Sequence, residues 1–169
     1  MCDDLLHLIV QGVARGATPL ERLEAMLPLS MLSKRFRSVV KAARPKLLEA
    51  AAHELVSSTG SRAYEEVLNL SSLQMDTLGC EALAEALKQG LVCRHVTTVW
   101  LQDNNIGARG LRWISQGLAS CQLDSLRSVS IGSNAFHAQL SNPPPELRRE
   151  LDLLERVANK RRIRVRLFT

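Results

Sequence analysis

The chain has 169 residues, 46% of them apolar and 23% charged, with a formal net charge of +5. This composition is enough for one hydrophobic core and excludes disordered and fibrous classes of chain. The apolar runs are short and interrupted, and Asp3 and Asp4 stand where a secretory signal would carry positive charge, so we predict no membrane segment and expect a cytoplasmic or nuclear protein.

The positive charge is concentrated in the two flanks of the chain. Residues 142–169 carry eight Lys and Arg against four Asp and Glu, whereas residues 61–141 carry six against seven. A surface built to hold a polyanion would need its basic residues in the middle part. The distribution therefore disfavours a nucleic-acid partner, although a basic nucleic-acid-associated protein that uses the C-terminal segment remains an alternative.

The first sixty residues are predicted to form a helical unit. Apolar stripes follow three helix starts, at Asp3, at Thr18 and at Ser30, and Pro45 is expected to bend or restart the third helix. The Ser- and Gly-containing segment 57–61 reads as a linker. We therefore divide the chain into residues 1–60 and 61–169.

Part of this unit resembles an F-box. The run from Leu29 to Val40 has an apolar stretch, a small residue, basic residues, an aromatic and an apolar pair, and the run from Asp3 to Ile9 is similar to the first helix of that family. The resemblance implies docking on a Skp-type adaptor of a cullin-based ubiquitin ligase, with the chain as substrate receptor. The docking candidates are Leu5, Leu6, Ile9, Leu29, Leu32 and Phe36. The alternative is that these helices only cap the open end of a repeat array.

The segment 96–111 has the pattern of a leucine-rich repeat. Val99 and Leu101 suit a short strand, Asn104 and Ile106 suit a tight turn, and Gly110 opens a helical run. Long repeats with a full helix resemble the ribonuclease-inhibitor-like class. The resemblance implies an α/β fold: a short solenoid with parallel strands on its concave face, helices on its convex face, and an N-terminal helical cap.

Copies of this segment occur on both sides of it. Six residues lie 31 positions before their counterparts at Val99, Leu101, Ile106, Gly110, Ile114 and Leu118: these are Leu68, Leu70, Met75, Gly79, Leu83 and Leu87. Five more lie 30 positions after residues of the central copy: Leu126, Val129, Ile131, Asn134 and Phe136. We therefore predict strands near 66–70, 97–101 and 127–131.

The last unit departs from the pattern. Three prolines at 143–145 precede an amphipathic helix that Asn142 is expected to cap, and a final strand is predicted at 162–167, where Ile163, Val165 and Leu167 alternate with arginines. The alternation favours a charged edge strand that discourages further pairing. This helix and strand are expected to cap the C-terminal end.

Asn104 and Asn134 are predicted to be structural. An Asn side chain at the turn can bond backbone groups that the strand leaves behind, and stacked copies would form a ladder. The first copy has Leu73 at this position. We therefore expect a looser or differently bonded turn at 71–76.

The candidate binding residues are those between the buried strand positions, which should face the concave side. Asn69, Trp100, Ser130 and Arg164 are expected to form one row, and Ser71, Gln102, Gly132 and Arg166 a second. A Trp beside Arg is typical of an interaction hot spot. We therefore predict a protein partner of unknown identity that binds around Trp100; the alternative is that Trp100 is covered by the N-terminal helices or a loop.

No catalytic or metal motif is found. The chain has no phosphate-binding glycine loop and no metal-ligand spacing, and no Ser, Cys or His stands in a nucleophile context. The four cysteines show no paired spacing and are interpreted as reduced thiols, mostly small core residues. We predict a non-enzymatic protein without cofactor or metal.

Overall fold

The computed structural model describes residues 34–58, 66–92 and 94–167, with the side chains of the first helix from Arg44 to Ser57. Helices and strands alternate along the described chain. The helices are α3 (Lys34–Ser58), α4 (Thr77–Gln89), α5 (Ala108–Ser120) and α6 (Pro145–Arg161), and a short 3-10 turn, η1 (His137–Gln139), precedes α6. The strands are β1 (Val67–Asn69), β2 (Thr98–Trp100), β3 (Ser128–Ser130) and β4 (Arg164–Arg166).

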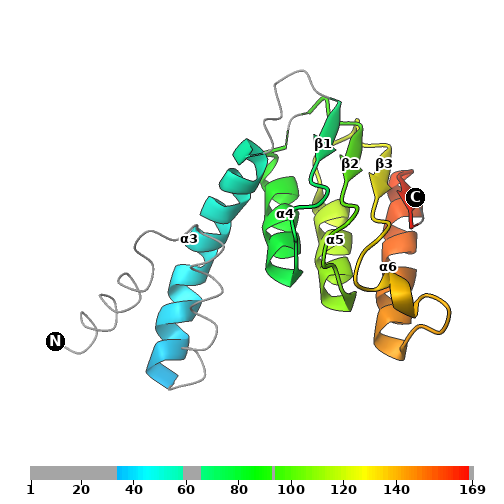
Figure 1. Cartoon of the computed structure of the whole chain (residues 1–169). Coiled ribbons are helices and arrows are strands. Elements are labelled where there is room, and N and C mark those ends of the chain that lie inside the picture. Colours follow the sequence, from blue (N-terminus) through cyan, green and yellow to red (C-terminus); the bar gives the residue numbers. More distant parts are fainter. Residues whose placement is uncertain (1–33, 59–65, 93, 168–169) are drawn as a thin grey trace.

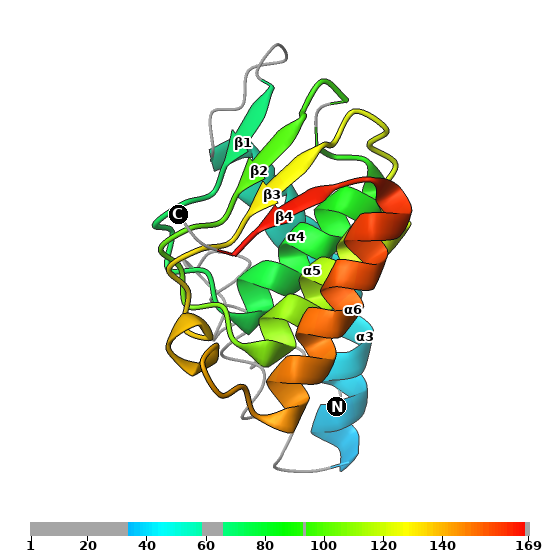
Figure 2. The ribbon, with the colours of Figure 1, turned by 90° about the vertical axis from the view of Figure 1, so that its right-hand side faces the viewer.

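The four strands form one parallel sheet in the order β1-β2-β3-β4. The helices stand side by side in a row (Figure 1), and they cover one face of the sheet only (Figure 2). The predicted α/β arrangement of parallel strands alternating with helices is therefore confirmed. We call the sheet face turned away from the helices the open face.

The core lies between the sheet and the helix row. The register pairs Leu68 with Val99 and Val99 with Val129, as the offsets of 31 and 30 residues predict. All three side chains are buried against the helices, together with the matching helix residues Ile114 and Leu118. Because one unit cannot bury its own apolar face, each unit depends on its neighbours for a core.

The turns after the first three strands share one left-handed position. A non-glycine residue takes the left-handed conformation at the equivalent positions Ser72, Asp103 and Ser133, with φ of 58°, 55° and 53°. The side chains of Asn104 and Asn134, which immediately follow two of these residues, are buried. Each turn thus leads the chain from the strand toward the next helix through one equivalent left-handed residue, and the first turn has a second one at Gln74, with φ of 54°.

Asn104 bonds backbone groups of its own unit and of the preceding one. Its amide nitrogen donates to the carbonyl oxygens of Leu101 (3.0 Å) and Leu70 (2.9 Å), and its Oδ1 accepts from the N–H groups of Leu73 (3.0 Å) and Met75 (2.9 Å). The turn at 71–76 is therefore bonded by the asparagine of the next unit. The sequence predicted a looser or differently bonded turn there, and the second alternative is found, because this turn has no asparagine of its own and is bonded by that of the next unit.

Asn134 repeats this pattern one unit later. It donates to the carbonyl oxygens of Ile131 (3.0 Å) and Leu101 (2.8 Å), and its Oδ1 accepts from the N–H of Ile106 (3.1 Å). The predicted ladder is thus present, and it joins neighbouring units rather than only closing each turn.

The helix ends differ from one unit to the next. Asp76 caps α4, because its Oδ1 accepts from the N–H groups of Leu78 (2.9 Å) and Gly79 (3.1 Å). The prediction that Asn142 caps α6 is wrong. The cap position is Pro144, without a side-chain bond, and Pro145 occupies the first turn, where a missing N–H costs nothing.

Helix α3 runs through Pro45 as one helix and packs on α4. The carboxylate of Glu81 is buried on α4 and pairs with the guanidinium of Arg44 at 2.5 Å. Ala52 and Leu55 bring the second half of α3 to the core of the repeats. No helix in the described ranges is long and apolar enough to cross a bilayer.

Candidate functional site

The open face carries one exposed aromatic residue in the middle of the sheet. Trp100 ends β2 and is 40% exposed, although its strand neighbours Val99 and Leu101 are buried. Successive side chains in a strand point to opposite faces, so a residue between two buried aliphatics must stand on the open face. Within the described residues, the predicted exposure of Trp100 is confirmed.

The row that contains Trp100 differs from the predicted one at its end. The register aligns Asn69, Trp100, Ser130 and Arg166 across the four strands, whereas Arg164 aligns with Ser128. The step from β3 to β4 is 36 residues, not the 34 that the prediction used. A shift of the β4 register by two residues keeps each β4 side chain on its predicted face of the sheet and changes only the β3 residue beside it.

The exposure of the row members also differs. Asn69 and Arg166 are exposed like Trp100, but Ser130 is only 5% exposed and offers a partner little surface. Neighbouring strands lie roughly 5 Å apart. Trp100 and Arg166, two strands apart, therefore stand about 10 Å from each other on one face, close enough for a single partner to touch both.

The second predicted row is partly present. The Ser71 hydroxyl donates to Oε1 of Gln102 at 3.1 Å, which ties the two residues together beside the Trp100 row. Gln102 is half-buried, and Arg166 belongs to the first row instead of this one. The open face thus has an aromatic centre with polar residues along one side and arginines at the β4 end.

The helix side has a polar groove between α5 and α6. Arg109, Arg112 and Trp113 line it from α5, and Glu146 and Glu150 line it from α6. Trp113 is half-buried and contacts the core. Two arginines facing two glutamates leave the groove without net charge, so it selects no charge class of ligand.

The described cysteines are core residues and not reactive groups. Cys80 and Cys121 are buried and free, as the sequence predicted. Burial raises the pKa of the Cys80 thiol to about 12, and the nearby Asp76 carboxylate adds to this shift. A thiol that stays protonated at neutral pH is a poor nucleophile.

Two sets of predictions are not tested by this geometry. Among the residues that the structure covers, no three His, Cys, Asp or Glu side chains are close enough to hold a metal ion, and the predicted lack of a cofactor stays a prediction. The adaptor-docking candidates lie outside the described part: Leu5, Leu6, Ile9, Leu29 and Leu32 precede it, and Phe36 belongs to α3 without a described side chain.

The comparisons with known proteins leave the family open. No family model matches the chain, and no curated protein is significantly similar to it.

Proposed function

We propose that the chain is a non-catalytic interaction module that binds a protein partner on its open face, centred on Trp100. The observation that carries the proposal is the exposure of Trp100, 40% for a large aromatic in the middle of a sheet whose opposite face packs against the helices. In the described residues, only one other large hydrophobic side chain, that of Leu73, is exposed.

The chemistry of the row suits protein recognition. A Trp ring offers a large apolar area with few rotatable bonds, and an Arg offers a planar set of donors, so these two types dominate the binding energy of protein interfaces. Trp100 and Arg166 share a row, and Asn69 adds a hydrogen-bonding group at its other end. A partner would cover an aromatic anchor between polar contacts.

We further propose that the repeated units are a short leucine-rich-repeat solenoid of the ribonuclease-inhibitor-like class, capped by α3. Three observations support this assignment. The paired residues of neighbouring parallel strands are 31 and 30 positions apart, the helices lie on one side of the sheet, and Asn104 and Asn134 form a ladder of hydrogen bonds between units. In such an array the strand face is the surface that a rigid scaffold leaves free for binding.

The test is co-purification with the full chain as bait, with the retained proteins identified by mass spectrometry. Trp100→Ala should abolish capture of the partner and change the free energy of unfolding by less than about 1 kcal/mol, because the side chain is already partly hydrated. Leu73→Ala is the matched control, since it removes the other exposed large hydrophobic side chain, which lies in the turn after β1 and is not a member of the Trp100 row.

Both variants must first show the thermal unfolding of the unmodified chain. If Trp100→Ala retained the same proteins as Leu73→Ala, the proposed binding centre would be wrong. A loss of stability of several kcal/mol would show instead that Trp100 belongs to the core.

A further inference from the structure

The outer edge of β4 is the other surface with a definite chemical character. β4 is the last strand of the described sheet, and in Figure 2 it lies with α6 at the end of the array that faces the viewer. Its residues Arg164 and Arg166 are exposed, and Val165 between them is half-buried. This pattern separates a charged side from an apolar side along one strand.

The hydrogen bonds show which backbone groups of β4 point outward. The N–H of Arg164 donates to the Arg127 carbonyl (2.8 Å), and the Arg166 carbonyl accepts from the N–H of Ile131 (2.9 Å). Alternate residues of a parallel strand direct their backbone groups to the same neighbour. The N–H and C=O of Val165 therefore point away from β3, in the direction in which a further strand would add.

An apolar groove follows this edge. It has a volume of about 410 Å³ between β4 and α6, and Asn159 and Arg164 border it together with an aliphatic lining from both elements: Leu151, Leu154, Ala158, Ile163, Val165 and Leu167. Leu151, Val165 and Leu167 are only half-buried. The groove can therefore take aliphatic side chains from a strand laid against β4.

Charge divides the two sides of the edge. Arg162, Arg164 and Arg166 are exposed along and beside β4, and Arg127 stands with the first two around a neighbouring hollow. Arg161 is not part of this set, because its guanidinium donates to backbone carbonyls of the β2 to β3 connection. The α6 rim of the groove carries the acidic residues Asp152 and Glu155.

We propose that the edge of β4 binds an extended segment of a partner protein in which acidic and aliphatic residues alternate. Residues paired across two strands place their side chains on the same face. Acidic side chains opposite Arg164 and Arg166 would lie on the arginine side, and the aliphatic ones between them would enter the groove beside Val165. Asp152 and Glu155 would repel acids there, which reinforces the alternation.

Charge argues against the other occupants of a strand edge. A second copy of the chain paired through β4 would bring arginines opposite arginines, which is unfavourable. A nucleic-acid strand would meet the arginines but would leave the aliphatic groove and the outward N–H of Val165 unused. The edge site shares Arg166 with the Trp100 row but does not use Trp100, so Trp100→Ala distinguishes failure of one site from failure of the other.

The probe is a fluorescein-labelled peptide of sequence Glu-Val-Glu-Leu-Glu-Val-Glu, measured by fluorescence anisotropy with the full chain. It should bind saturably, and its affinity should fall at least about tenfold as sodium chloride is raised, because the arginine contacts are screened. A peptide of the same composition in the order Glu-Glu-Val-Leu-Val-Glu-Glu should bind at least about tenfold more weakly. A version with Lys in place of Glu should not bind.

Two variants test the two halves of the geometry. Val165→Pro removes the outward N–H and leaves the described β3 to β4 bonds in place, since proline is tolerated where an edge N–H faces solvent. The double variant Arg164→Glu/Arg166→Glu reverses the charge of the strand. Both should abolish peptide binding, whereas Trp100→Ala should not affect it.

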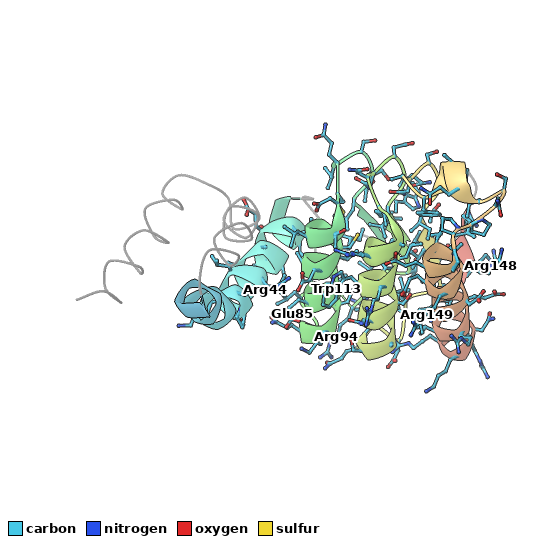
Figure 3. The ribbon with its side chains drawn as sticks, turned by 90° about the horizontal axis from the view of Figure 1, so that it is seen from below. Arg44, Glu85, Arg94, Trp113, Arg148 and Arg149 are labelled. Atoms are coloured by element: carbon cyan, nitrogen blue, oxygen red, sulfur yellow. The ribbon has the colours of Figure 1, made fainter. Side chains whose placement is uncertain are left out.

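The matched control is Arg148→Glu/Arg149→Glu, which makes the same charge change at the start of α6 (Figure 3), outside the groove lining. It should bind the peptide nearly as well as the unmodified chain. If circular dichroism showed that Val165→Pro is unfolded, the comparison of peptide binding by the two charge-reversal variants would test the proposal.

Four binding results would each overturn the proposal. They are equal binding of the reordered peptide, equal loss in the α6 control, absence of binding at millimolar peptide, and tighter binding of a labelled single-stranded RNA with the same arginine dependence. The proposal would also be overturned if the chain self-associated in sedimentation and the Val165→Pro variant did not, because this would show that the edge of β4 pairs with a second copy.

Discussion

At the scale of single residues, the two buried asparagines hold the units together. An Asn side chain has two donor hydrogens and one acceptor oxygen, and the turns offer carbonyls on one side and N–H groups on the other. The amide nitrogen of Asn104 shares its two hydrogens among three carbonyl oxygens, those of Leu70, Leu101 and Gln102, and its oxygen accepts from two N–H groups. No other side chain of this size supplies both functions in the same geometry.

We expect Asn104→Ala to lower the free energy of unfolding by about 3 kcal/mol or more, because buried backbone groups of two units lose their partner. Asn104→Asp should be nearly as harmful, since its carboxylate would face carbonyl oxygens. Urea unfolding measures the loss. Asn105→Ala is the control, because this neighbouring side chain is exposed and should cost less than about 0.5 kcal/mol; similar losses at both positions would contradict the assigned role.

Sequence spacing predicted that these asparagines are structural, but not which units they join. An offset of about 30 residues shows which positions are equivalent; it does not show that Asn104 reaches back to Met75. The burial of Ser130 could not be predicted either, because the sequence does not distinguish Ser130 from Ser128 on the same strand. Exposure of one residue depends on what lies beside its strand.

At the scale of elements, the spacing of α4 and α5 depends on a glycine. A Cβ added to Gly117 would stand 2.7 Å from the Cα of Ala84, a backbone atom of α4 that cannot turn aside. The two helices therefore approach as closely as their backbones allow at this point. At Gly110, α5 also approaches α4 closely, because an added Cβ would lie 3.0 Å from the sulfur of Cys80.

Gly117→Ala should destabilise the fold, although alanine is favoured over glycine in a helix by about 1 kcal/mol. Overpacking costs typically about 1–3 kcal/mol, so we expect a net loss of about 1 kcal/mol in the free energy of unfolding. Gly107→Ser is the control at the start of the same helix, where an added Cβ has open space and a hydroxyl can cap. It should show no loss; stabilisation by Gly117→Ala would refute the close contact.

The elements themselves followed from the sequence, except for the register of the last strand. The six residues matched at one offset located β1, β2 and the two helices after them, because buried positions must recur when units stack. Before β4 the proline-rich segment changes the repeat length. Ile163, Val165 and Leu167 alternate equally well in either of two registers two residues apart, so apolar periodicity could not choose between Arg164 and Arg166.

At the scale of the molecule, one apolar core runs through all the described units. It extends from Ala52 on α3 through the strands and helices of the repeats to Ile163 beside β4. The asparagine bonds cross the same boundaries. In stacked units, strong interfaces between neighbours make unfolding cooperative, because a unit that loses its neighbour exposes its apolar face.

We therefore expect a single unfolding transition in urea. Trp100→Phe leaves Trp113 on α5 as the one tryptophan, whose fluorescence reports on the central unit, while far-ultraviolet circular dichroism reports on all helices, including α3 and α6. The two signals should give the same midpoint and the same slope, as two-state unfolding requires. A circular dichroism transition at lower urea than the Trp113 transition would show that an end helix unfolds alone, and the core would then be weaker at that end than the continuous packing indicates.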